Sequence, residues 1–198
     1  MKFVNLVLVL VGFLILSGCT SAPLPPNQEA KTSEINPEDP KFANKALVSG
    51  FTGISNYGFL DLTRQCATGV LRFINAETSD ETYLLYASLN YNIGNISFVS
   101  LDPGTYYVIE VICSRENITF DLRHDYNDQI TRKLVPHFTV NKQEVVFLGL
   151  FEIFDKKSRI NGKKIGAINI KPVEGILEQI REQNPLLADS LVVRLAEF

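Results

Sequence analysis

The chain has few of the residues and motifs that enzymes use for catalysis. It contains only two histidines, His124 and His137, and no serine lies within a Gly-x-Ser-x-Gly pattern. No glycine-rich phosphate loop precedes the helical pattern near the C-terminus, and no two cysteines have the Cys-x-x-Cys spacing of redox sites. These absences exclude the common hydrolase, nucleotide-binding and thiol-exchange signatures. We therefore expect a protein that is not an enzyme and that holds no cofactor or metal.

An excess of positive charge is also missing. The formal net charge is -3 at pH 7. Proteins that bind nucleic acid usually carry a basic surface that neutralises phosphates. Nucleic acid is therefore not expected as a partner.

Residues 1–18 have the features of a secretory signal. Lys2 supplies a positive charge, and residues 3–15 form an apolar run that only Asn5 and Gly12 interrupt. The run is shorter than the roughly 20 apolar residues that a membrane-spanning helix needs. This length favours a signal segment over a spanning helix.

The next four residues, Leu16-Ser17-Gly18-Cys19, resemble the lipobox of bacterial lipoproteins. The resemblance implies cleavage before Cys19 and acylation of its thiol and its new amino group, with palmitate among the chains. Two or more acyl chains anchor a protein stably to a membrane. Because Thr20 rather than aspartate follows the cysteine, we expect the outer membrane, with the protein facing the periplasm. The alternatives are an uncleaved anchor helix and an ordinary secretory signal that leaves Cys19 as a free thiol.

A proline-rich segment follows the cysteine. Prolines 23, 25, 26, 37 and 40 lie among small, polar and acidic residues. Such a composition predicts an extended tether with little to bury. The predicted organisation is a signal peptide over residues 1–18, a lipidated cysteine and tether over residues 19–42, and one folded domain over residues 43–198.

Assigning Cys19 to lipid leaves Cys66 and Cys113 as an even pair. In an oxidising compartment such a pair predicts a disulfide. The chain-entropy model values a loop of this length at about 4 kcal/mol. Two buried, reduced thiols are the alternative.

From residue 46 onward the sequence has a β pattern. Short runs rich in valine, isoleucine, phenylalanine and tyrosine alternate with turn residues, which is typical of strands. The predicted strands cover residues 67–74, 82–89, 95–101, 105–113, 118–122, 137–140, 144–154, 163–170 and 190–197. One helix is predicted after Pro172, because Val173, Ile176, Leu177 and Ile180 have helical spacing and Asn184-Pro185 ends the pattern.

Strict alternation predicts which residues share a face in two of these strands. In residues 105–113 it groups Tyr107, Ile109, Val111 and Cys113, and both faces are so apolar that we expect an internal strand. In residues 144–154 it groups Val145, Phe147, Phe151 and Ile153. Gly149 interrupts the second strand and predicts a bulge, a bend or a close backbone approach.

A family resemblance supports the β interpretation. The run Leu101-Asp102-Pro103-Gly104-Thr105-Tyr106-Tyr107-Val108 resembles a strand start in prealbumin-like and carboxypeptidase-regulatory-like β-sandwiches. Residues 138–140 and 144–149 are similar to stretches of uncharacterised bacterial lipoproteins with that architecture. The resemblance implies a mainly β fold, an antiparallel sandwich of about seven to eight strands with one helix in the C-terminal half, and no catalytic residues.

Five cationic residues surround the turn signal Asn161-Gly162. They are Lys156, Lys157, Arg159, Lys163 and Lys164. Asparagine followed by glycine predicts a hairpin, so these cations would gather at its tip. They are candidates for binding an anionic partner, such as lipid head groups, envelope polymers or an acidic protein. The alternative is a solvated hairpin whose lysines discourage edge-to-edge pairing.

A second polar cluster comprises Asp121, His124, Asp125, Tyr126, Asn127 and Asp128. Its oxygen and imidazole groups are potential cation ligands. The spacing matches no calcium-binding loop, however, so we expect a solvated loop and no metal site.

These observations together predict a non-enzymatic cell-envelope lipoprotein that acts as a binding, structural or accessory module. Its expected partners are the membrane, through the acyl chains, and another envelope protein or an anionic envelope component. The alternative function is a ligand carrier or an enzyme that acts on envelope lipid or glycan. A deep pocket with convergent polar groups would favour the alternative, and a filled core with a charged or apolar patch would favour the binding module.

Overall fold

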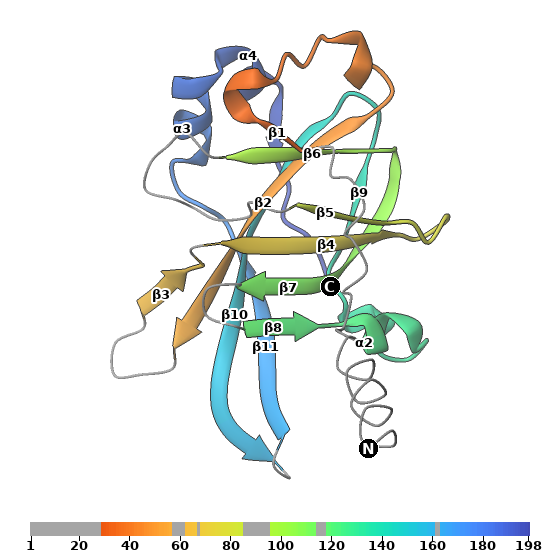
Figure 1. Cartoon of the computed structure of the whole chain (residues 1–198), viewed down its shortest axis with the longest axis vertical. Helices are drawn as coiled ribbons and strands as arrows, with labels where there is room; N and C mark the ends of the chain where they lie inside the picture. The colour runs from red at the N-terminus through yellow and green to blue at the C-terminus, as the bar shows by residue number, and fades with distance from the viewer. Residues whose placement is uncertain (1–28, 57–61, 67, 85–95, 114–117, 161–162) are drawn as a thin grey trace, which may run out of the picture.

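Two β-sheets pack face to face in the computed structural model, which describes residues 29–56, 62–66, 68–84, 96–113, 118–160 and 163–198 (Figure 1). Sheet A has the order β1-β6-β2-β10-β11, with β12 beside β10 and β3 beside β2. Sheet B has the order β5-β4-β7-β8, with β9 beside β7. Most pairs are antiparallel, and β10 is parallel to β2 and β12. The predicted mainly β, largely antiparallel sandwich is confirmed.

The strands of sheet A are β1 (Glu29–Lys31), β2 (Ala46–Asn56), β3 (Leu62–Gln65), β6 (Ser97–Leu101), β10 (Val145–Ile160), β11 (Lys163–Lys171) and β12 (Leu191–Val193). Those of sheet B are β4 (Gly69–Asn75), β5 (Glu81–Leu84), β7 (Gly104–Cys113), β8 (Ile118–Asp121) and β9 (His137–Val140). In the described part of the chain, the helices are α2 (Arg123–Asn127), α3 (Ile176–Gln183) and α4 (Pro185–Ser190), and the 3-10 turns are η1 (Thr32–Glu34), η2 (Pro40–Phe42) and η4 (Arg132–Leu134).

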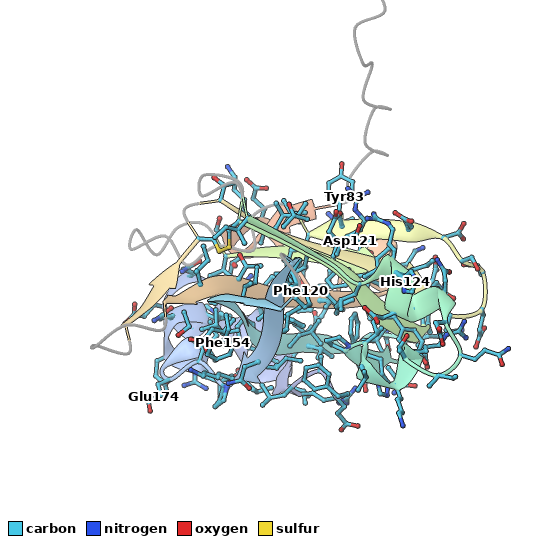
Figure 2. The ribbon with its side chains drawn as sticks, turned by 90° about the horizontal axis from the view of Figure 1, so that it is seen from below. Tyr83, Phe120, Asp121, His124, Phe154 and Glu174 are labelled. Atoms are coloured by element: carbon cyan, nitrogen blue, oxygen red, sulfur yellow. A yellow bond between two sulfur atoms is a disulfide. The ribbon has the colours of Figure 1, made fainter. Side chains whose placement is uncertain are left out.

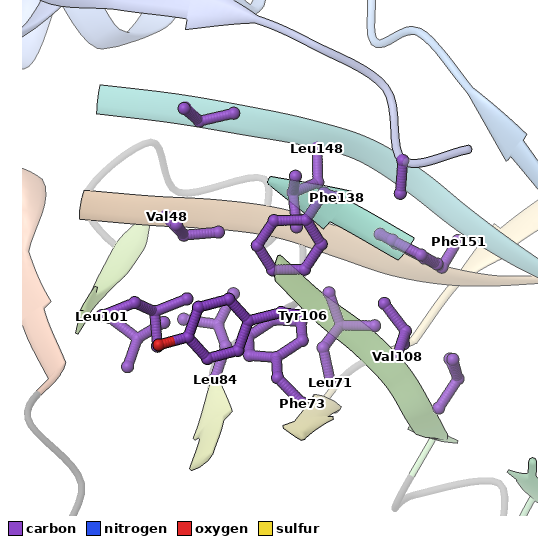
Figure 3. Packing of buried hydrophobic residues seen from close by; sticks show 14 of the residues in the cluster. Val48, Leu71, Phe73, Leu84, Leu101, Tyr106, Val108, Phe138, Leu148 and Phe151 are labelled. Carbon is purple, nitrogen blue, oxygen red and sulfur yellow. The ribbon is translucent and has the colours of Figure 1, made fainter. Parts of the chain in front are cut away.

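The main core lies between the two sheets. Phe73 of β4 and Tyr106 of β7 pack around Phe138 of β9, at ring-centroid distances of 5.3 and 5.7 Å from it. Val48 and Leu148 reach the same cluster from sheet A (Figure 3). Aromatic pairs at such separations add to the stabilisation from buried apolar area. The described part of the sandwich interior is therefore filled by side chains.

Bulges in β10 and β7 change which side chains share a face, so the faces differ from those that strict alternation predicts. In β10 the register against β2 shifts between Phe147 and Leu150, around Gly149. Val146 and Leu148 therefore share the inter-sheet core with Phe151 and Ile153, whereas the sequence pattern grouped Phe147 with Phe151. An inserted residue moves every later side chain of a strand to the other face. The predicted irregularity at Gly149 is confirmed, and the predicted face grouping is wrong.

The same change occurs in β7. Its register against β4 shifts where Arg72 faces Glu110 and Phe73 faces Val108. Tyr106 and Val108 thus lie in the core together with Val111 and Cys113. The predicted internal position of this strand is confirmed, because β7 lies between β4 and β8.

A second apolar cluster covers the outer face of sheet A. Phe51 and Phe147, with ring centroids 5.1 Å apart, project from the sheet toward Ile180 of α3 and Leu187 of α4. Residues 29–42 join this cluster: Ile35 and Phe42 are buried within it, and β1 pairs with β6. The tether predicted to extend to residue 42 is therefore wrong over residues 29–42, because apolar Ile35 and Phe42 anchor that part to the domain. Residues 19–28 lie outside the described residues.

The C-terminal helical region differs in detail from the sequence pattern. Helix α3 begins at Ile176 rather than after Pro172, because Gly175 takes a left-handed conformation with φ of 69°. The expected end at Asn184 is confirmed, and the Asn184 side chain accepts a hydrogen bond from Leu187 N at the start of α4. The predicted closing strand over residues 190–197 is reduced to the three residues of β12.

Candidate functional site

The hairpin of β10 and β11 extends beyond its neighbours in sheet A. The pairing of β10 with β2 ends where Phe154 faces Ser55, whereas its pairing with β11 continues to Ile160 and Lys163. Beyond Phe154, β11 is the only described strand that pairs with β10. Residues 155–160 of β10 cover about 20 Å at about 3.3 Å per residue. Figure 1 shows this end of the hairpin projecting at the bottom of the molecule. We call residues 155–164 the ribbon.

All five cations predicted from the sequence belong to the ribbon. Lys156 faces Ile165 across the hairpin, and Arg159 faces Lys164. Lys157 lies within the register shift between Lys156 and Arg159, and Lys163 begins β11. The side chains of these residues and the turn residues 161–162 lie outside what the structure describes, so the assignment rests on backbone position and sequence. The ribbon contains five cationic residues and one acidic residue, Asp155.

A small polar pocket lies at one end of the sandwich, where the β4–β5 and β6–β7 turns approach each other. Its volume is about 230 Å³. Its lining is mostly polar and consists of Lys45, Asn75, Glu77, Thr78, Asp80, Thr82, Ser100, Leu101, Asp102, Pro103 and Tyr106. Pockets that enclose drug-sized ligands usually span roughly 300–1,000 Å³. This pocket is therefore smaller than a typical small-molecule site.

The polar groups of the pocket largely bind one another. Lys45 Nζ lies 2.7 Å from Asp102 Oδ1, and the Tyr106 hydroxyl donates to the Asp102 carbonyl oxygen at 2.9 Å. The side-chain oxygen of Asn75 accepts hydrogen bonds from the backbone N–H groups of Glu77 and Thr78. Burial raises the pKa of Tyr106 above its ordinary value of 10.0. These contacts shape the two turns and give the pocket a structural role.

An ion-pair network on the outer face of sheet B was not predicted from the sequence. Arg72 Nε donates to Glu110 Oε2 at 2.8 Å, and Arg123 Nη1 lies 3.2 Å from Glu110 Oε1. Glu81 lies 3.5 Å from both guanidinium groups. The four residues come from β4, β5, β7 and the start of α2, so the network joins distant segments. No local motif signals such a network, since its members meet only through strand register.

The acidic cluster near residue 125 folds into α2 and the turn after it. The carboxylate of Asp128 accepts hydrogen bonds from the backbone N–H groups of Ile130 and Thr131. Asp121 is the last residue of β8, and His124 is the second residue of α2 (Figure 2). In the described part of the chain, no three histidine, cysteine, aspartate or glutamate side chains are grouped to hold a metal ion. The cluster thus forms a short helix rather than the irregular loop that we expected.

The disulfide predicted between Cys66 and Cys113 is present, and Figure 2 draws it as a yellow bond. The two Cα atoms are 5.1 Å apart, within the range usual for disulfides. Cys66 follows β3 of sheet A and Cys113 ends β7 of sheet B, and both side chains are buried. The bond therefore links the two sheets. Cys19, the predicted lipidation site, lies outside the described residues.

Among the side chains that the structure describes, large apolar ones are exposed at three places, one of which is the C-terminal Phe198. Ile130 and Leu134 are exposed in the segment around η4, and Leu186, Val192 and Val193 are exposed on α4 and β12. None of the helices that the structure describes has both the length and the apolar character that crossing a membrane requires.

Comparison with models of known protein families found no match, and comparison with curated proteins found no relative. Function is therefore inferred from the residues of this chain.

Proposed function

We propose that this protein is a lipid-anchored, non-enzymatic component of the bacterial cell envelope, and that it binds an anionic envelope component or partner through the ribbon. One observation carries the proposal. Five cationic residues are concentrated in a two-stranded hairpin that extends past β2, on a chain whose net charge is negative. A projecting cationic element is suited to reach a partner that the rest of the acidic surface would repel.

The expected strength of such binding follows from simple electrostatics. Each lysine or arginine held near an anionic membrane surface contributes about 1 kcal/mol, and the attraction decays within a Debye length of about 8 Å at physiological salt. Several cations on one ribbon therefore act together only against a dense negative surface or a polyanion. Binding that weakens steeply with salt is the expected signature.

The assignment to the envelope rests on sequence and on one structural feature that agrees with it. From the lipobox-like sequence we infer that Cys19 is acylated, that the acyl chains anchor the protein to the outer membrane, and that the domain faces the periplasm. The disulfide between Cys66 and Cys113 supports an oxidising compartment, because such bonds are rare in the reducing cytosol.

The alternative is a ligand carrier or an enzyme acting on envelope lipid or glycan. The polar pocket near Tyr106 is the feature that favours it. Its volume of about 230 Å³ and its internally bonded polar groups fit the binding module better.

Anchoring is tested by labelling cells that express the full chain with a radioactive fatty acid. We expect strong labelling of the parent and loss of label in the Cys19→Ser variant. Equal labelling of the two proteins would contradict the lipoprotein assignment.

Ribbon binding is tested on the full-length protein in nanodiscs of neutral lipid. Vesicles containing anionic lipid and soluble polyglutamate serve as probes. Reversal of Lys156, Lys157 and Lys163 to glutamate should weaken binding of at least one probe tenfold or more. The matched control reverses Lys31, Lys133 and Lys142, which are exposed and lie outside the ribbon, and should retain binding. Failure of the parent to bind either probe would overturn the proposal.

A further inference from the structure

Strand β11 forms an edge of sheet A. Among the described residues it pairs with β10 alone, along nine residues from Lys163 to Lys171. The outward backbone N–H and C=O groups of an edge strand are available to another strand. Most proteins cover or interrupt so long an edge, and no described strand pairs with the outer side of this one.

One end of β11 is fixed to the core of the sandwich. Ile168 and Ile170 pack partly buried against the inter-sheet cluster. Lys171 lies next to them, with its Nζ 2.6 Å from Glu152 Oε2. Packing against the core and the ion pair with Glu152 therefore fix the C-terminal end of β11 to the sheet.

The charges of β11 are of one sign. Lys163, Lys164 and Lys171 are its only charged residues, and the middle of the strand contains Gly166 and Ala167, whose side chains are small or absent. Lysines on an edge discourage neutral apolar strands, since pairing would crowd and desolvate them. The same lysines would not oppose a strand whose carboxylates lie next to them, because opposite charges attract.

Pairing between two copies of β11 is disfavoured by the same charges. A symmetric antiparallel pairing along the whole strand would place Lys163 of one copy opposite Lys171 of the other, whose charge Glu152 offsets only in part because Lys171 remains partly exposed. Like charges directly opposite each other destabilise a strand pair. The edge is thus suited to a strand of opposite charge rather than to itself.

We propose that β11 accepts an extended acidic segment of a protein partner, which adds to sheet A as a further strand. The partner's main chain would hydrogen-bond to the open edge, and its carboxylates would lie beside Lys163 and Lys164. Strand addition of this kind draws affinity from main-chain hydrogen bonds and selectivity from side chains. This inference rests on the proposed function and specifies the partner as an acidic peptide rather than a lipid surface.

The test uses the full-length protein in nanodiscs of neutral lipid and three fluorescent ten-residue peptides. In the first peptide, pairs of glutamates alternate with pairs of valines, so both faces of the added strand carry carboxylates. The second has the same sequence with every backbone nitrogen methylated, and the third has lysine in place of each glutamate. Methylation keeps the charge of the first peptide and removes its main-chain donors. We expect the first peptide to bind and the other two to bind at least tenfold more weakly.

Two variants locate the site. Lys163→Glu combined with Lys164→Glu should weaken binding of the acidic peptide at least tenfold. The control, Lys133→Glu combined with Lys142→Glu, should leave it unchanged. Hydrogen exchange should slow at the backbone amides of β11 when the acidic peptide binds.

Each contrary result has a distinct meaning. If the methylated peptide binds as tightly as its parent, strand addition is wrong and the ribbon attracts anions by charge alone. If only anionic vesicles bind, in a manner sensitive to ribbon charge, strand addition is again wrong while the proposed function stands. Absence of binding to every anionic probe would overturn both.

Discussion

The backbone groups of His137 and Glu197 exchange two hydrogen bonds, of 2.7 and 2.8 Å. His137 begins β9 in sheet B, while the preceding residues of the C-terminal segment pair with β10 in sheet A through β12. Arg194 strengthens this segment by binding Glu144 with two nitrogens, each 3.2 Å from a carboxylate oxygen, and by donating to the carbonyl oxygen of Thr139. Residues 191–197 therefore join the two sheets along one side of the sandwich.

The pair of Arg194 and Glu144 makes stability depend on pH. Hydrogen bonds from Arg194 lower the pKa of Glu144 from its ordinary value of 4.5 to about 2. A lowered pKa stabilises the fold above the unfolded value, and that stabilisation is lost as the pH falls from about 4.5 toward 2. Because Arg194 is partly exposed, we expect Arg194→Met to lower the free energy of unfolding at pH 7 by only about 1 kcal/mol.

Urea denaturation of the parent and Arg194→Met at pH 7 and at pH 2.5 checks this prediction. The difference between the two proteins should shrink at the lower pH, where Glu144 becomes partly protonated. A difference that stays constant between the two pH values would contradict the role of the carboxylate.

The disulfide should contribute substantially to stability. Cys66 and Cys113 connect the two sheets, and a native disulfide typically contributes about 2–4 kcal/mol to stability. We expect the double variant Cys66→Ala/Cys113→Ala to lose about that much in the free energy of unfolding. Reductant should destabilise the parent and leave the double variant unchanged, and equal responses of the two proteins would argue against an intact bond.

The effects of mutating Glu152 and Lys171 on the free energy of unfolding should be strongly coupled. The glutamate side chain is fully buried, and Lys171 Nζ lies 2.6 Å from it while remaining partly exposed. Removing only the cation leaves a buried carboxylate without this ion pair, so Lys171→Met should cost about 2 kcal/mol. The double variant Lys171→Met/Glu152→Leu should be more stable than Lys171→Met alone. A double-mutant cycle in urea measures the coupling, and additive costs would refute it.

Two glycines with positive φ provide a matched comparison. A Cβ atom on Gly149, where φ is 97°, would lie 2.6 Å from Leu195 Cδ2 and 2.7 Å from the carbonyl oxygen of Lys171. A Cβ atom on Gly175, where φ is 69°, would meet no atom within 4 Å. We expect Gly149→Ala to cost about 3 kcal/mol and Gly175→Ala only about 1 kcal/mol, the penalty of the backbone conformation alone. Thermal unfolding of the two variants tests the difference, which equal costs would contradict.

The sequence pattern predicted most of the strands but not all of their faces. Residues 137–140 form β9 as predicted, and residues 104–113 form the internal strand β7. Alternation failed beyond Gly149 and near Ile109, since a bulge depends on the register of a neighbouring strand and leaves only a weak local signal. Ile35 and Phe42 were missed as core residues because prolines and polar residues around them outweighed two isolated apolar side chains.

The candidate site was predicted in part. The sequence predicted five cations around a turn. The structure adds that the hairpin extends beyond the last residue of β2 that pairs with β10. The open edge of β11 could not have been predicted, because sheet order depends on contacts between distant segments. The ion pairs of Glu110 with Arg72 and Arg123 could not be predicted either, because they too join segments that are distant in the sequence.

The docking of residues 29–35 determines where mechanical tension would act on an anchored molecule. If Cys19 is acylated as proposed, force transmitted along the chain enters the described residues at Glu29, in the three-residue pairing of β1 with β6. Behind that pairing, Thr32 binds the carbonyl oxygen of Ile96, and the Asn184 amide donates to the carbonyl oxygens of Thr32 and Ile35. A pull on the anchor is thereby shared between the first strand and the junction of α3 and α4. The edge strand β11, at the opposite end of the sheet order, stays outside the path of the force.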